Sequence, residues 1–212
     1  MDEKRDKAII VIGRQFGSGG RSIGRNLARR LGYKYYDTEL LKNVARRYGF
    51  SEGIFRSHEE KRPSVLRSML QGTFGIADNF HEVSISSERL YAEQSKVIRE
   101  IASEGGCVIV GRTADYILRD FPNMTSIFLH APVEYRCSHI VDRGEAINYS
   151  QAIEMAKKRD KARENYYNYF TGTNLWGKAS NYDLCLDSSC IDEEAIVNII
   201  ISYIKDKFKR NK

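Results

Sequence analysis

The feature that most constrains this 212-residue chain is a glycine-rich segment at residues 13–22, which reads GRQFGSGGRS. We call it the glycine-rich loop. The apolar, β-branched run at residues 8–12 precedes it, and such a continuous run is typical of a strand buried on both faces of a parallel sheet. Behind the loop, apolar residues recur at helical spacing until Gly32, which marks a helix end. A strand, a glycine-rich turn and a helix N-terminus in this order bring backbone N–H groups together, which indicates a phosphate-binding site.

Two residues at the end of the loop add the chemistry of a Walker-type phosphate loop, which needs a cation beside the phosphates and a hydroxyl for magnesium. Arg21 and Ser22 occupy those two positions. The strict pattern has glycine and lysine where this chain has Gln15 and Arg21. A glycine-rich turn that merely joins strand to helix remains the alternative. The residues expected to bind the phosphates of a nucleotide are Gly17, Ser18, Gly19, Gly20, Arg21 and Ser22, with Ser22 also the expected magnesium ligand.

The rest of the chain alternates between strand-like and helix-like segments. Four further strands are predicted, at residues 33–36, 107–110, 125–129 and 182–186. Helices are predicted at residues 38–48, 84–103, 114–119 and 150–170, after Pro132, and from residue 191 onward. This alternation predicts a single α/β domain with a five-stranded parallel sheet covered by helices on both faces.

Three finer expectations concern the helices. Thr38 and Ser150 are the expected N-caps of the helices that follow them. Residues 50–82 show no regular pattern. In the last helix the expected core-facing residues are Ile191, Ala195, Ile196, Ile199, Ile200, Tyr203, Ile204 and Phe208.

Composition narrows the class of partner. The formal charge of +6 and the pI near 9.1 favour an anionic partner. The basic residues are mostly scattered, without an arginine-rich tail, so a small phosphorylated ligand is favoured over nucleic acid. No apolar run is long enough for a membrane span. The charged N-terminal residues and four cysteines without metal-ligand spacing favour a reducing, cytoplasmic location; oligomeric state is not predicted.

The chain resembles the cytidylate-kinase-like group of nucleoside monophosphate kinases, and within that group it is most similar to the divergent branch. The resemblance covers nearly the whole chain except residues 50–82, and it rests on the order and spacing of several short segments. These are GSGGR at 17–21, LGYKYYD at 31–37, VGRTADY at 110–116, FLHAP at 128–132, RDKAR at 159–163 with Tyr166 and Tyr167, and YDLCLD at 182–187.

The resemblance implies a three-layer P-loop NTPase fold with ATP and Mg²⁺ as cofactors. It implies one kinase-like domain over residues 1–212, with a helical acceptor-binding region and insertion at about 38–104 and a lid at about 143–172. Asp37 falls where the family contacts the acceptor nucleoside, and Arg112 where an arginine grips the acceptor phosphate. Arg159 and Arg163 fall in the lid. One departure is Asn43, which stands where the family has an acceptor-site arginine.

A site dominated by arginines suits phosphoryl transfer, because this reaction depends on charge neutralisation, positioning and exclusion of water. The expected catalytic residues are Arg21, Arg112, Arg159 and Arg163; the expected substrate-binding residues are Asp37, Arg112 and Asp115.

Each of these residues has an alternative role. Arg112 follows a buried strand and so emerges at the ligand-binding edge of the sheet, although a surface salt bridge is the alternative. Asp115 is expected to order Arg112 or to hold a magnesium-bound water, or else to act as a charge at a helix N-terminus. Arg159 and Arg163 share one helical face, which in the alternative is simply solvated. Asp37 either contacts the acceptor or caps the next helix.

Together with the resemblance, these residues lead us to expect ATP-dependent phosphoryl transfer to a nucleoside monophosphate, with CMP or dCMP as the first guess. Two alternatives stay open. One is a kinase for another small-molecule acceptor, and the other is a nucleotide-binding regulatory protein without transfer activity.

Overall fold

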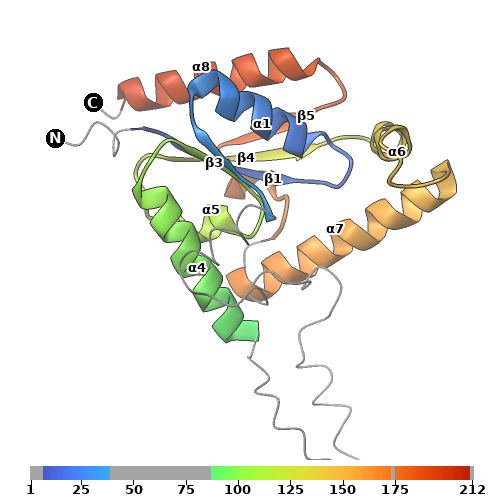
Figure 1. Ribbon diagram of the computed structural model, residues 1–212, viewed down its shortest axis with the longest axis horizontal. Helices are drawn as coiled ribbons and strands as arrows, with labels where there is room; N and C mark the ends of the chain where they lie inside the picture. The colour runs from blue at the N-terminus through green and yellow to red at the C-terminus, as the bar shows by residue number, and fades with distance from the viewer. Residues whose placement is uncertain (1–6, 39–86, 173–174, 211–212) are drawn as a thin grey trace, which may run out of the picture.

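The computed structural model describes residues 7–38, 87–172 and 175–210. Its centre is a five-stranded sheet in the order β2-β3-β1-β4-β5 (Figure 1). The strands are β1 (Ile9–Arg14), β2 (Lys34–Tyr36), β3 (Cys107–Val110), β4 (Met124–His130) and β5 (Leu184–Asp187). Every pair of neighbouring strands in this sheet is parallel, and each strand lies within two residues of its predicted position.

Helices cover both faces of the sheet, which gives the predicted three-layer α/β arrangement. The described helices are α1 (Gly20–Leu31), α4 (Ser87–Ser103), α5 (Ala114–Ile117), α6 (Val133–Asp142), α7 (Tyr149–Thr171) and α8 (Glu193–Arg210). Figure 1 shows α1 and α8 on one face, and α4 and α5 on the other. The predicted helix at residues 38–48 and the irregular segment at 50–82 lie outside the described residues, except for Thr38.

The central strand β1 explains why its sequence is apolar at every position. Ile9 and Val11 pack against α4 and α5, whereas Ile10 and Ile12 pack against α1 and α8. All four side chains are at most 1% exposed. A strand covered on both faces has no solvent side, so its hydrophobic residues do not alternate with polar ones. This buried strand is the fixed base from which the glycine-rich loop leaves the sheet.

Two helices differ from the prediction in detail. The N-cap of α7 is Asn148, whose side chain accepts a hydrogen bond of 2.9 Å from Gln151 N, and Ser150 lies inside the first turn. Asparagine and serine cap helices about equally well, so capping preference alone does not favour Ser150 over Asn148. In α8, Ile199 is exposed and Val197 belongs to the buried stripe instead; Ile191, which was expected to face the core, precedes the helix and is also exposed. None of the described helices has an apolar stretch long enough to cross a membrane.

Candidate active site

The glycine-rich loop joins β1 to α1 through two glycines in the left-handed region. Gly17 has φ +87° and Gly19 has φ +76°, values that only glycine adopts without strain. A Cβ at Gly17 would lie 2.7 Å from the carbonyl oxygen of Arg136, so α6 packs directly on the loop. Gly19 is the N-cap of α1 and supplies no side-chain cap, and the first helical turn has no acidic residue. The N-terminus of α1 is therefore suited to receive an anion.

Gln15, which stands where the Walker pattern has glycine, ties the loop to the end of β4. Its backbone N–H donates to Leu129 O at 2.9 Å, and its side-chain Oε1 accepts from Ala131 N at 3.1 Å. The fully buried Ser18 donates through its hydroxyl to Gln15 O at 2.9 Å and lies 3.2 Å from Leu129 O. The side chains of Gln15 and Ser18 thus hold the shape of the loop.

Helix α7 is fixed to the loop by a carboxylate that the sequence did not single out. Asp160 Oδ1 accepts a hydrogen bond of 2.7 Å from Phe16 N, and its Oδ2 accepts one of 2.7 Å from Arg136. Arg136 also donates to Phe16 O and Ala131 O, each at 3.0 Å. Burial raises the pKa of Asp160, and this shift is opposed by the Phe16 N–H and the nearby guanidinium groups of Arg163 and Arg136. The carboxylate links α6, α7 and the loop.

Both arginines predicted for the lid lie on the loop-facing side of α7. Arg163 donates to Arg14 O at 3.2 Å, and its side chain is 12% exposed. The guanidinium carbons of Arg159 and Arg163 lie 5.8 and 5.4 Å from the centre of the Phe16 ring. This face of α7 is therefore packed on the loop rather than fully solvated. The roles of the two arginines in a reaction stay predictions.

Arg112 leaves the sheet through a strained turn at the end of β3. Gly111, Arg112 and Thr113 have φ values of +83°, +63° and +53°. A positive φ is uncommon for arginine and rarer still for a β-branched threonine, and each such residue costs about 1–3 kcal/mol. Thr113 donates to Arg112 O at 2.6 Å, and Arg112 Nε donates to Thr38 Oγ1 at 3.3 Å. The turn thus holds Arg112 at the carboxyl edge of the sheet, as predicted from its position after a strand.

Asp115 has a different partner from the one expected. Its carboxylate is buried and accepts a hydrogen bond of 2.6 Å from the Tyr167 hydroxyl. Burial raises the pKa of Asp115, and the Tyr167 hydroxyl partly offsets the shift. In the described structure Asp115 therefore joins α5 to α7 instead of ordering Arg112.

The remaining predicted residues lie around the loop and β2. Arg21 and Ser22 are exposed in the first turn of α1. Asp37 is only 4% exposed and lies 3.6 Å from the guanidinium of Arg25. Whether Asp37 contacts an acceptor stays a prediction.

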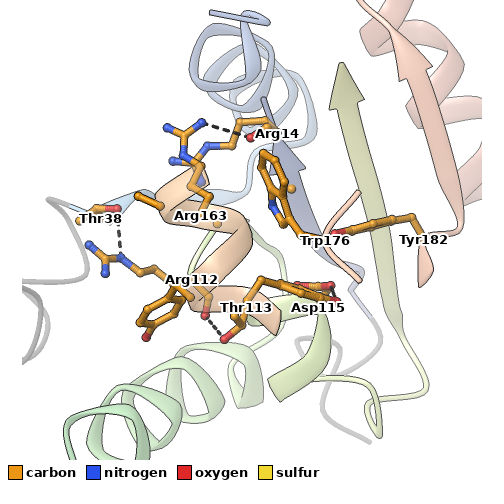
Figure 2. Close-up of a pocket in the computed structure, with 13 residues that line it drawn as sticks. Arg14, Thr38, Arg112, Thr113, Asp115, Arg163, Trp176 and Tyr182 are labelled. Carbon is orange, nitrogen blue, oxygen red and sulfur yellow. Dashed lines mark hydrogen bonds between the residues drawn. The ribbon is translucent and has the colours of Figure 1, made fainter. Parts of the chain in front are cut away.

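Two adjoining pockets lie at this edge of the sheet. The loop pocket is lined by residues 14–21, Arg143, Glu145 and Arg163. The other, which we call the arginine–aromatic pocket, includes Arg14, Arg112, Arg163, Tyr166, Tyr167, Trp176 and Tyr182 in its wall. Figure 2 shows the guanidinium groups on one side of this pocket, and Trp176 and Tyr182 on the other. Arg14 and Arg163 are common to the two pockets.

The aromatic side of the pocket is a packed wall. Phe128 of β4 lies 5.4 Å from Trp176 and 5.0 Å from Tyr182, measured between ring centres. A Cβ at Gly13 would lie 2.9 Å from the Phe128 ring, so this ring fills the space beside the strand. On α7, burial raises the pKa of Tyr166 to about 12, and its hydroxyl donates to Gln94 at 3.0 Å. Trp176 and Tyr182 give the pocket a water-excluding side opposite its arginines, whereas Tyr166 lies beside Arg112.

The site thus combines a glycine-rich loop, a strained turn that carries an arginine, and a helix that carries two arginines. One family model matches most of this chain. The model of the cytidylate kinase-like family matches residues 9–190. The chain belongs to the cytidylate kinase-like family. It is 27% identical over 197 residues to a cytidylate kinase of Saccharolobus islandicus (strain L.S.2.15), covering 92% of this chain and 90% of that one. A cytidylate kinase of Pyrococcus abyssi is 24% identical over 204 residues, with 95% and 96% coverage.

Solved structures give the same fold for this family member. An uncharacterized protein from Eubacterium ventriosum matches with a TM-score of 0.70 and 28% identity, covering 94% of this chain and 99% of that one. The gluconokinase of Sinorhizobium meliloti matches with a TM-score of 0.53 and 16% identity, covering 97% and 96% of the two chains. The shikimate kinase of Bacteroides thetaiotaomicron gives 0.53 and 11%, covering 93% and 98%. At these identities the two kinases establish the P-loop kinase fold alone.

Three site residues of this family member were missed from the sequence: Arg14, Arg136 and Asp160. Arg14 follows the apolar run at residues 8–12 after one glycine, as Arg112 follows that of β3 after Gly111, so the rule that found Arg112 applies to Arg14 as well. Asp160 is the one carboxylate inside the basic run at residues 157–163. Its isolated position there was a weak indication that it pairs with a buried group elsewhere in the fold. Nothing in the local sequence indicated Arg136.

Proposed function

We propose that this chain transfers the γ-phosphoryl group of ATP to a nucleoside monophosphate, with CMP or dCMP as the first acceptors to test. The observation that carries the proposal is that the loop pocket adjoins the arginine–aromatic pocket at the carboxyl edge of one parallel sheet. A kinase needs two such sites, one for each phosphorylated substrate, with cations between them. Membership of the cytidylate kinase-like family and the names of the archaeal relatives support the choice of acceptor.

In this proposal the glycine-rich loop is the donor site. Its left-handed glycines and the uncapped N-terminus of α1 suit the backbone N–H groups to bind phosphate oxygens. Arg21 adds a positive charge, and the exposed Ser22 hydroxyl is available as a magnesium ligand. Mg²⁺ held there with the help of Ser22 would supply positive charge to neutralise the nucleotide phosphates. Among the described residues no cluster of three or more acidic, histidine or cysteine side chains forms a metal cage, which fits a metal held largely by nucleotide phosphates.

The acceptor side is assigned to the arginine–aromatic pocket. Arg112 would bind the acceptor phosphate, while Arg159 and Arg163 would neutralise charge from the side of α7. We propose residues 143–172 as a lid and residues 38–104 as the acceptor-binding region. Asp37 and Asp115 are the proposed substrate-binding residues. The aromatic wall would keep water from the transferred group, which otherwise would be hydrolysed.

A coupled assay of ADP release tests the proposal. The protein is offered ATP and Mg²⁺ with a panel of nucleoside monophosphates, and ATP binding is measured in parallel on the wild type and on Arg21→Ala. We expect turnover with CMP or dCMP and weaker ATP binding by the variant. No turnover with any acceptor, together with unchanged ATP binding by Arg21→Ala, would overturn the proposal.

A second candidate is a kinase for another small phosphorylated or hydroxylated acceptor. The observation that favours it is Asn43, which replaces the acceptor-site arginine of the family. Thermal-shift screening against a metabolite panel separates the two, since a different acceptor would raise Tm where CMP does not. Tight ATP binding without magnesium-dependent turnover would instead indicate a regulatory nucleotide-binding protein.

A further inference from the structure

Arg14 is the last residue of β1, and it lies where the two pockets meet. It is only 8% exposed, whereas Arg21, the cation of the loop motif, is exposed. Of the described lining residues, Arg14 and Arg163 alone belong to both the loop pocket and the arginine–aromatic pocket. Arg163 reaches this point from α7, whereas Arg14 is part of the sheet itself.

Two glycines leave room for the Arg14 side chain. A Cβ at Gly20, the first residue of α1, would lie 2.9 Å from both Cβ and Cγ of Arg14. A Cβ at Gly111, at the exit of β3, would overlap the Arg14 guanidinium. The side chain therefore starts against the loop end of α1 and finishes beside Gly111, the residue before Arg112. It extends from the expected donor phosphates to the expected acceptor phosphate.

The backbone of Arg14 is held by the sheet and by α7. Arg14 pairs with Leu129 in the β1–β4 register, and its carbonyl oxygen accepts the hydrogen bond from Arg163. Figure 2 shows the two arginines joined by this bond at the top of the arginine–aromatic pocket. A cation fixed in this way before substrate binds needs no reorganisation when charge develops beside it.

We propose that Arg14 is a further catalytic residue, whose guanidinium contacts the phosphoryl group as it passes from donor to acceptor; this inference rests on the proposed function. The bond from the γ-phosphorus to the β,γ-bridging oxygen breaks, and its electron pair stays on ADP. An ionised oxygen of the acceptor monophosphate forms the new P–O bond. Arg14 donates hydrogen bonds to the equatorial oxygens and transfers no proton, and its forked donors suit this planar group.

The test compares Arg14→Met, which removes the charge, with Arg14→Lys, which keeps it. Arg29→Met is the matched control, because Arg29 is exposed in the last turn of α1. We expect Arg14→Met to lower kcat by about 100-fold or more, with ATP Kd changed by less than about threefold. Arg14→Lys should lose about 10-fold, since it keeps the charge without the fork. Arg29→Met should match the wild type, and Tm is measured for all four proteins.

Three outcomes would overturn the inference. These are wild-type kcat in Arg14→Met, equal losses in the lysine and methionine variants, and a loss of kcat that is matched by an equal loss of ATP affinity. If Arg14→Met unfolds below the assay temperature, Arg14→Lys decides alone, with wild-type kcat as the contradicting result.

A binding measurement separates this inference from the proposed function. If the wild type turns over no acceptor, calorimetry with ADP and aluminium fluoride, which mimics the transferred group, still tests Arg14. Loss of fluoride-dependent ADP binding in Arg14→Met, with ATP binding kept, would support the role of Arg14 although the proposed acceptor had failed. Equal fluoride-dependent binding by the wild type and Arg14→Met, or its absence from both, would overturn it.

Discussion

The carboxylate of Asp160 on α7 accepts a hydrogen bond of 2.7 Å from the backbone N–H of Phe16 in the glycine-rich loop. The same carboxylate pairs with Arg136 at 2.7 Å, and the two side chains are only 15% and 11% exposed. Helix α7 also carries Arg159 and Arg163. This carboxylate therefore helps to set the position of the two arginines relative to the loop, together with the hydrogen bond from Arg163 to Arg14 O.

Removing that carboxylate is expected to destabilise the protein. Asp160→Ala leaves Arg136 buried without its counter-charge, and breaking such a pair from one side costs about 3–5 kcal/mol. The double variant with Arg136→Met should lose less than the sum of the two single variants, because no uncompensated charge remains. Urea unfolding measures all three. Lys161→Ala is the control, since its exposed pair with Glu164 contributes at most about 1 kcal/mol. Additive losses would contradict this account of the pair.

Gly17 and Gly32 offer a matched test of the loop. Both have positive φ, +87° and +65°, but only Gly17 faces a neighbour, the Arg136 carbonyl oxygen. Gly32→Ala should cost about 1–2 kcal/mol through backbone strain alone. Gly17→Ala should cost a further ~1–3 kcal/mol through overpacking and should also weaken ATP binding. Urea unfolding and calorimetry with ATP provide the two readouts; equal losses in the two variants would show that the contact with α6 is unimportant.

Asp115 gives a pH-dependent prediction. Its pKa in the folded protein is raised above its ordinary value of 3.8, mainly by burial. At a pH below 3.8, the ordinary pKa of the carboxyl, the folded and unfolded states both hold the Asp115 proton. As pH rises, the folded state keeps a proton that the unfolded state releases, so the free energy of unfolding falls. Asp115→Asn stays neutral and can still accept the hydrogen bond from Tyr167. The variant should therefore gain stability relative to the wild type as pH rises from acidic to neutral. Urea unfolding across that range checks this, and a constant difference would be the contrary result.

The sheet could be predicted from the sequence because burial on both faces leaves a simple mark, a continuous apolar run ending at glycine. The runs of β1 and β3 show it clearly. The inward face of α8 was predicted less well, because Ile199 and Val197 are both apolar and periodicity could not choose between two adjacent stripes. That choice depends on how α8 packs on the sheet.

The place of Arg112 in the fold was predictable from chain order. Only Gly111 separates it from a buried strand, so its position at the carboxyl edge of the sheet could be predicted, while its role in binding a phosphate stays a prediction. The contact between Asp160 and Phe16 joins residues 144 positions apart, so no local pattern could reveal it. Arg14 was missed for another reason. It was assigned to the glycine-rich loop, although β1 extends as far as Arg14.

The central claim is that the two pockets act together in moving a phosphoryl group. Its most direct test follows the labelled γ-phosphoryl group of ATP in the presence of Mg²⁺ and CMP, by chromatography of the products. The account predicts label in CDP with the wild-type protein, and at least about 100-fold slower labelling with Arg112→Met at unchanged ATP affinity. Label that stays in ATP or appears only as inorganic phosphate, whether CMP, dCMP or another monophosphate is offered, would contradict it.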